Sequence, residues 1–221
     1  MLKPGPNPIE KIVSPTFVSC INSFNTNKMV GDDIFPNSSK ILYDAFVSSS
    51  LNDNLLSNTI FGDGAAAVII TSNDFDKKGL SIKGFYSLLL NKGKDLMGWN
   101  ITPVNFEMIL DSKIPEMIGD EVNSIVANAS KKLNISPQSI SKWAIHPGGK
   151  KIIDVIKTKL HLTDLDTNAS YKILDEFGNM SSPTILFVLN ELMEEYKAGE
   201  TIFSIGFGPG LSIETALFAY E

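Results

Sequence analysis

The chain has 221 residues, of which 43% are hydrophobic, so it is long enough to bury the core of one or two globular domains. A net charge of -6 and the lack of a basic run interleaved with aromatic residues argue against a nucleic-acid partner. The first residues lack the apolar stretch of a signal peptide, and no apolar run could span a bilayer, which predicts a cytoplasmic protein without a membrane partner. One cysteine and two histidines exclude an internal disulfide and make a metal site improbable.

The first part of the chain predicts a strand, a loop and a glycine turn. The apolar run from Ile12 to Cys20, interrupted by a proline, predicts a buried strand, and residues 31–54, rich in Ser, Asn and Asp, predict a long surface loop. Residues 61–70 read as a glycine turn that leads into a strand of small and β-branched side chains.

From Leu80 the pattern restarts with a strand and then a long helix. Apolar residues between Ile114 and Leu133 recur with the spacing of one helical face. Residues 143–145 form a short apolar run that stops at His146 and a Pro-Gly-Gly turn, and helical spacing resumes over residues 152–160. The pattern predicts a strand, a turn and a helix.

The C-terminal part predicts one more helix and two strands. Ser181 and Ser182 precede a proline and provide a cap and first turn for a helix that closes near Gly199. Residues 201–207 and 211–219 then read as strands joined by a glycine-rich turn. Strands that alternate with helices and end in adjacent strands predict an α/β layered fold with a largely buried mixed sheet.

Two polar residues stand where chemistry is plausible. His146 follows an apolar strand and precedes two glycines, a place where side chains emerge from a sheet and the backbone can approach a ligand. Asn179 lies just before the last helix, so its amide can face the same crevice. A core histidine and an N-cap asparagine are the structural alternatives. His161, Asp164 and Asp166 are interpreted as solvated residues of a polar linker.

Four motifs in order resemble those of the chalcone and stilbene synthases, the type III polyketide synthases: FGDGAAA at 61–67, HPGG at 146–149, GNMSS at 178–182 and GFGPG at 206–210. The resemblance runs from about Ile12 to the end and covers the later part of a typical family member. It implies a thiolase-like layered fold and a homodimer. With a polar break at 72–78, residues 1–78 would be the end of the N-terminal half and residues 79–221 the C-terminal domain.

The resemblance also implies a reaction. In the family a cysteine thiolate receives an acyl group from acyl-CoA, and a histidine and an asparagine decarboxylate malonyl-CoA to give the carbanion that extends the chain. By resemblance His146 and Asn179 are those two residues, and the CoA thioesters are substrates with no cofactor or metal. Two neutral donors aimed at the thioester oxygen would stabilise the enolate as an oxyanion hole does.

Further residues are assigned to substrate binding by the same resemblance. Gly148 and Gly149 would lie along the pantetheine arm of CoA, and Phe106 is similar to a gatekeeping phenylalanine between the CoA tunnel and the cavity. The loop that shapes the cyclisation pocket would be Gly206, Phe207, Gly208, Pro209 and Gly210.

The sequence departs from the family at the nucleophile. Cys20 is followed by Ile-Asn-Ser-Phe instead of glycines and a helix, and it resembles a later, non-catalytic cysteine. This chain alone is therefore expected to lack the nucleophile and to need a homodimer or a separate N-terminal half. The loop at 25–54 is also longer than in plant enzymes of the family.

Two alternatives remain open at this point. A ketoacyl carrier-protein synthase III-like enzyme also pairs His with Asn, but Met180-Ser181-Ser182 and Pro209 argue against it. A non-catalytic dimerising or regulatory protein is supported by the missing nucleophile and opposed by the retained His146 and Asn179.

Overall fold

The computed structural model describes residues 11–13, 59–71, 79–101, 103, 106–195 and 197–221. Its strands are β1 (Lys11–Val13), β2 (Ile69–Thr71), β3 (Gly79–Leu89), β4 (Met97–Ile101), β5 (Phe106–Leu110), β6 (Lys142–Ile145), β7 (Thr201–Gly208) and β8 (Ser212–Tyr220). Its α-helices are α5 (Ile114–Leu133), α6 (Lys150–Lys159), α7 (Asp164–Phe177) and α8 (Ser182–Glu194). Two short 3-10 helices are η1 (Asn91–Gly93) and η2 (Pro137–Ser139).

One mixed sheet organises the fold. Six strands lie in the order β2-β1-β3-β8-β7-β6, and β4 and β5 form a separate antiparallel pair. Within the large sheet β6 and β7 are parallel, and the other neighbours are antiparallel. The sheet therefore matches the predicted mixed α/β architecture, and β6, which leads to His146, lies at its edge.

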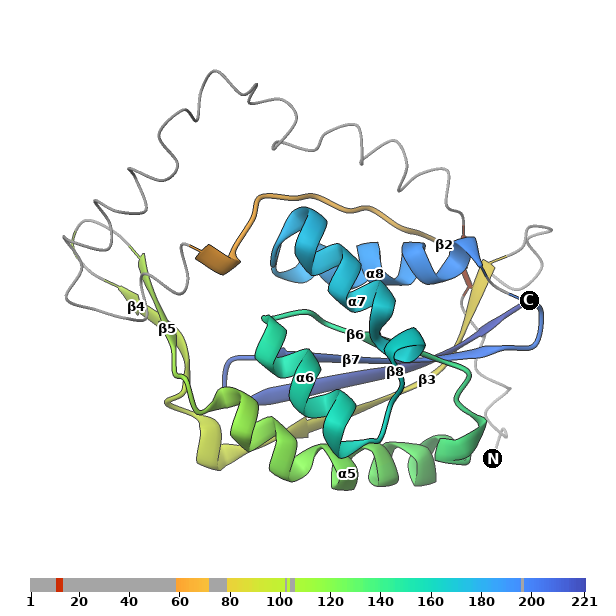
Figure 1. Cartoon of the computed structure of the whole chain (residues 1–221), viewed down its shortest axis with the longest axis horizontal. Coiled ribbons are helices and arrows are strands. Elements are labelled where there is room, and N and C mark those ends of the chain that lie inside the picture. Colours follow the sequence, from red (N-terminus) through yellow and green to blue (C-terminus); the bar gives the residue numbers. More distant parts are fainter. Residues whose placement is uncertain (1–10, 14–58, 72–78, 102, 104–105, 196) are drawn as a thin grey trace, which may run out of the picture.

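Helices cover both faces of this sheet (Figure 1). Helix α5 lies along one face and packs with α6, whereas α7 and α8 lie on the other face. Neighbouring residues of β7 show the division, because Phe203 belongs to the core under α5 and Ile202 to the core under α8. This alternation is the two-residue period of a strand that is buried on both faces.

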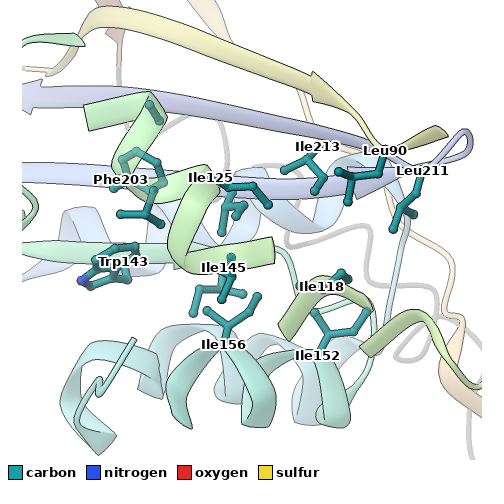
Figure 2. Close-up of a cluster of buried hydrophobic side chains, with 14 of the residues drawn as sticks. Leu90, Ile118, Ile125, Trp143, Ile145, Ile152, Ile156, Phe203, Leu211 and Ile213 are labelled. Atoms are coloured by element: carbon teal, nitrogen blue, oxygen red, sulfur yellow. The ribbon is translucent and has the colours of Figure 1, made fainter. Parts of the chain in front are cut away.

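The larger core lies between the sheet and α5 (Figure 2). Helix α5 contributes Ile118 and Ile125, and Trp143 from β6 packs against Phe203 with ring centroids 5.4 Å apart and the ring planes tilted by 56°. The helix has a proline in its first turn, and it is followed by Asn134, whose φ of 53° gives the left-handed cap that closes many helices. The periodic residues that predict this helix are the ones that fill the core.

Several sequence predictions are confirmed. The helix predicted over Ile114–Leu133 has these bounds, and β3, β6, α6, β7 and β8 occupy the segments predicted for them. Most of the strand predicted from Ile12 to Cys20 and the whole loop at 31–54 lie outside the described residues. The division of the chain at residue 78 stays a prediction.

Two local predictions are confirmed only in part. A short linker does follow α6, and His161 and Asp164 are exposed, but the linker ends at Thr163, because α7 begins at Asp164 with a capping box between Thr163 and Asp166. Ser181 is the N-cap residue of α8 and a proline lies in the first turn, as predicted, but the Ser181 side chain makes no capping hydrogen bond, and its backbone carbonyl instead accepts from the Thr184 amide at 3.1 Å.

Candidate active site

His146 is the first residue after β6. Its backbone N–H donates to the Ile205 carbonyl of β7 at 2.8 Å, which continues the parallel pairing one step past the strand. Its side chain lies on the α7 and α8 side of the sheet, beside Gly206 of β7, where an added Cβ would lie 3.8 Å from the His146 Cβ. After His146 the chain leaves the sheet at Pro147, and α6 begins only at Lys150. The imidazole therefore lies at the end of the sheet.

The His146 imidazole is neutral at pH 7. Desolvation of the ring lowers the pKa of His146 to about 4. Within the described residues no side chain forms an ion pair with the ring, so burial is the cause of the shift. A neutral imidazole carries one N–H donor, which can hydrogen-bond to a developing oxyanion. A ring with so low a pKa is poorly suited to take up a proton as a general base.

Asn179 follows α7 and Gly178 and is 5% exposed. Its Oδ1 accepts a hydrogen bond from the Ser181 backbone N–H at 2.8 Å, and its Nδ2 donates to the Gly148 carbonyl at 3.3 Å. These two bonds fix which end of the carboxamide faces the site. Because an NH2 group carries two hydrogens, one donor is left for a ligand.

His146 and Asn179 converge on the backbone of Gly148. An added Cβ at Gly148 would lie 3.9 Å from Nε2 of His146, and the Gly148 carbonyl accepts from the Asn179 amide. The Gly148 N–H donates in turn to the His146 carbonyl at 2.9 Å. Two residues that are distant in sequence thus form one cluster with neutral donors, as the sequence predicts for a pair facing one crevice.

Ser181 has a strained backbone beside this cluster. Its φ of 64° and ψ of -130° lie in a region that residues other than glycine rarely adopt. This conformation lets the Ser181 N–H donate to the Asn179 side-chain oxygen. At the same time the Ser181 carbonyl accepts from the Thr184 N–H in the first turn of α8. Strain of this kind costs about 1–3 kcal/mol and persists where the surroundings impose it.

The glycine turn at 61–64 supports Asn179 from the other side. The Asn179 N–H donates to the Ile60 carbonyl at 2.8 Å, and the Gly62 N–H donates to the Asn179 carbonyl at 3.0 Å. An added Cβ at Gly62 would lie 2.3 Å from the Phe177 carbonyl oxygen, and at Gly64 it would overlap Met180. The first of the four motifs is therefore a scaffold against the backbone of the third.

Gly62→Ala is expected to destabilise the fold and move Asn179. The contact at 2.3 Å is with backbone, which cannot swing aside, and overpacking typically costs about 1–3 kcal/mol. Urea unfolding should show this loss. Gly98→Ala is the matched control, because no atom lies within 4 Å of its added Cβ. Equal stability of the two variants would contradict the close approach.

A pocket of about 460 Å³ adjoins the cluster. Its walls include the backbone of Gly148, Gly149 and Gly178 together with apolar side chains such as Ile114 and Leu174. Its charged lining residues are Asp111, Lys150 and Lys151. The pocket is therefore largely apolar, with charge from three side chains, and it is lined by Gly148, the residue whose carbonyl accepts from the Asn179 amide.

The GFGPG motif divides into two parts. Gly206 lies beside His146, whereas the Ser212 N–H donates to the Pro209 carbonyl at 3.2 Å and closes a turn between β7 and β8. Gly210 has a φ of 117°, and an added Cβ there would lie 2.9 Å from Leu89. Phe207 packs with the core under α5, on the sheet face opposite His146.

Two of the residues discussed from the sequence, Phe106 and Cys20, are not fully described by the structure. Phe106 begins β5, and its side chain lies outside the described residues, as does the whole of Cys20. No cluster of three or more His, Cys, Asp or Glu side chains suited to a metal occurs in the described part of the chain. Among the same residues, no helix is long and apolar enough to cross a membrane.

A pH dependence of stability follows from the His146 pKa. The pKa is depressed in the folded state to about 4 from an ordinary 6.5, so between these values the unfolded chain binds the extra proton. Stability should be full above pH 6.5 and fall by about 2–3 kcal/mol on acidification to pH 4.5 through this group alone.

The measurement is urea unfolding at pH 7 and pH 4.5 for the wild type and His146→Gln. Carboxylates whose pKa is held low by lysine partners, such as Asp154, add to acid destabilisation in both proteins and cancel in the comparison. The wild type should lose more stability than the variant. Equal losses would contradict a buried neutral imidazole.

The fold and site together define an α/β protein with a neutral pair of hydrogen-bond donors at the end of a parallel strand. The sequence matches the C-terminal domain of chalcone and stilbene synthases over residues 86–219. The chain belongs to the chalcone and stilbene synthase family, and the predicted family resemblance is confirmed.

Relatives show the same family. A chalcone-synthase-like protein of Bacillus subtilis is 32% identical over 176 residues, which cover 76% of this chain and 48% of the relative. The 3,5-dihydroxyphenylacetyl-CoA synthase of Streptomyces toyocaensis is 32% identical over 182 residues, 78% of this chain and 47% of the relative. The chain thus spans about half the length of these relatives.

A solved structure shows the same fold. The C-terminal type III polyketide synthase domain of Steely1, a type I/III hybrid from Dictyostelium, superposes with a TM-score of 0.73 at 24% identity. The match covers 77% of this chain and 49% of that domain chain. At this identity the likeness concerns the fold, and it confirms the predicted layered α/β architecture.

Proposed function

We propose that the protein takes part in the decarboxylative condensation of malonyl-CoA onto an acyl-CoA starter, as an acyltransferase of polyketide biosynthesis. The observation that carries this proposal is the convergence of His146 and Asn179 on the Gly148 backbone. Both side chains carry neutral N–H donors, and Gly148, on which they converge, lines a largely apolar pocket. This arrangement fits the stabilisation of a thioester enolate.

The chemistry needs no general base. The bond between C2 of the malonyl group and its carboxylate breaks, CO2 leaves, and the electron pair moves through C2 onto the thioester oxygen. The N–H of His146 and the second N–H of the Asn179 amide would donate to that oxygen as its charge grows. The enolate carbon then attacks the acyl group of the starter thioester, and the thiolate that carried it departs.

The pocket beside the cluster is the proposed site of the CoA arm. A pantetheine chain is narrow and largely apolar, so the glycine backbones at 148 and 149 allow it to pass without a side chain in its way. Lys151 lines the same pocket and forms no ion pair with any described residue. Its ammonium group is available to the phosphates of CoA, whereas Asp111 is the opposing charge.

The thiolate is proposed to come from outside the described residues, in a separate N-terminal half or a partner copy. Side chains that favour such an association are exposed on β3 and β4, namely Phe85, Leu89, Trp99 and Ile101. Burial of apolar groups of this size drives many protein associations. Soluble CoA thioesters as substrates favour the cytoplasm as the location.

We expect acyl-CoA starters to leave the mass of this chain unchanged. Cys20 has no activating neighbour in its sequence, and a nucleophilic thiol needs one to lower its pKa. Intact-protein mass spectrometry after incubation with several starters is the measurement. A stoichiometric adduct mapped to Cys20 would show that this chain carries the nucleophile itself.

The proposed function is tested by conversion of malonyl-CoA to acetyl-CoA by the chain, followed by liquid chromatography. Succinyl-CoA is the matched control, because its carboxylate is one carbon further from the thioester and its loss yields no enolate. Malonyl-CoA should be consumed and succinyl-CoA left intact. No acetyl-CoA above the uncatalysed rate, or equal consumption of both substrates, would count against decarboxylation at this site.

A further inference from the structure

Ser170 of α7 closes the open edge of the strand that leads to His146. In the described sheet β6 pairs with β7 alone, and the His146 N–H points to β7 through its bond to Ile205. The N–H and carbonyl of Ile145, one residue earlier, point away from β7 because these groups alternate along a strand. Both are satisfied by one side chain: Ser170 Oγ accepts from the Ile145 N–H at 3.2 Å and donates to the Ile145 carbonyl at 2.7 Å.

These bonds fix the peptide group that carries His146. The carbonyl oxygen of the peptide between Ile145 and His146 is held by Ser170, and the N–H of the same peptide is held by Ile205 at 2.8 Å. The following carbonyl, that of His146, accepts from Gly148. Hydrogen bonds therefore hold the two peptide planes that flank the His146 Cα. They set the direction of the His146 Cα–Cβ bond.

The same hydroxyl connects the two halves of the site. Ser170 is 0% exposed and belongs to α7, which ends at Phe177, two residues before Asn179. The rigid helix therefore links the Ser170 contact with β6 to the position of Asn179. The weaker bond from the Asn179 amide to Gly148, at 3.3 Å, is the second connection between the same two segments.

We propose that Ser170 is a positioning residue that sets the placement of His146 relative to Asn179. The proposal rests on the proposed function, since the pair it positions is the donor pair for the enolate. Ser170 itself is fully buried against Ile145 and does not touch the substrate pocket. It acts through the backbone, and its loss changes the geometry of the two donors without removing either of them.

The test uses Ser170→Ala, Ser170→Cys and Ser170→Thr. The first removes both hydrogen bonds, the second replaces the hydroxyl with a slightly larger thiol that is a weak donor, and the third keeps the hydroxyl. The matched control is Thr167→Val, one turn earlier on α7. Thr167 is also 0% exposed, but its hydroxyl bonds only to carbonyls of its own helix terminus, Thr163 at 3.2 Å and Asp164 at 3.4 Å.

The first readout is NMR and does not depend on turnover. Ser170→Ala and Ser170→Cys should shift both the His146 ring signals and the Asn179 side-chain NH2 signals, although Ser170 contacts neither side chain. The exposed His161 gives the only other histidine ring signals and serves as an internal reference. The Ile145 amide should also exchange with solvent at least about tenfold faster relative to the His146 amide, because it loses its acceptor. Ser170→Thr should restore the signals, and Thr167→Val should leave them unchanged.

The second readout is the decarboxylation of malonyl-CoA. Displacement of a catalytic group by about 1 Å can cost about a hundredfold, so Ser170→Ala should lower kcat by roughly ten- to a hundredfold with KM within about threefold. Unchanged His146 and Asn179 signals in the Ala and Cys variants, or equal shifts in Thr167→Val, would overturn the positioning role. So would shifted signals with an unchanged kcat. A wild type that does not decarboxylate malonyl-CoA refutes the proposed function, and the NMR result then still decides whether Ser170 sets this geometry.

Discussion

His146→Ala and Asn179→Ala are each expected to lower the rate of malonyl-CoA decarboxylation by about 10²- to 10³-fold. Each variant removes one N–H donor from the site where the enolate oxygen would lie, and loss of one such donor typically costs about 2.7–4 kcal/mol of barrier. The rate of acetyl-CoA formation measures the effect. In a complete system with a thiolate-bearing half, polyketide formation should fall in parallel.

The controls are His161→Ala and Asn128→Ala, which change exposed residues of the same types away from the site. Both should decarboxylate malonyl-CoA at the wild-type rate. Because His146 is already neutral above about pH 5, the wild-type rate should also show no step near pH 6.5. Undiminished turnover in either site variant would remove that residue from the mechanism.

Phe203→Ala is expected to lower the free energy of unfolding by about 3–5 kcal/mol, the usual loss when a buried aromatic ring is deleted from a core. Phe203 is 0% exposed, lies on a central strand and packs its ring on Trp143. Urea unfolding followed by circular dichroism gives the value.

Leu165→Ala is the control for this loss. Leu165 lies in the first turn of α7 and is 85% exposed, so its truncation should change stability by about 0.5 kcal/mol or less. A small effect at Phe203, or similar effects at both positions, would contradict the core between α5 and the sheet.

The parts of the fold that sequence predicts well are those with large apolar residues in a clear period. Helix α5 is the best case, since Ile118, Val122 and Ile125 recur on one face and fill the core. The strand before His146 is short, but it is bounded by a Pro-Gly-Gly turn and flanked by a periodic helix. In both cases the residues that create the pattern are the residues that are buried.

Helix α7 shows why other parts are missed. Its buried residues are Thr167, Ala169, Ser170 and Ile173, so three of its four buried side chains are small or polar and give little apolar signal. They are buried because α7 packs closely on β6, which is a tertiary effect. The usable signal was the Thr163 and Asp166 capping box, which marks a helix start.

The candidate site divides in the same way. The sequence motifs predict that His146 and Asn179 face one crevice, and the structure brings them together at Gly148. The part played by Ser170 could not be predicted, because it depends on which edge of β6 is open. Gly206 faces His146 and the Phe207 side chain faces the core under α5, on the other side of the sheet, because successive residues of a strand alternate between its two faces. The GFGPG motif alone does not reveal this alternation.

The most direct test of the two-donor site is the decarboxylation rate of Asn179→Asp. The Asp carboxylate keeps an oxygen that can accept from the Ser181 N–H, so the local turn is retained, but it has no N–H for the substrate and faces the Gly148 carbonyl. Asn128→Asp, on the exposed face of α5, controls for the added charge. Acetyl-CoA formation should fall by at least about a hundredfold in Asn179→Asp and stay at the wild-type rate in Asn128→Asp. A wild-type rate in Asn179→Asp would contradict a mechanism in which this amide stabilises the enolate.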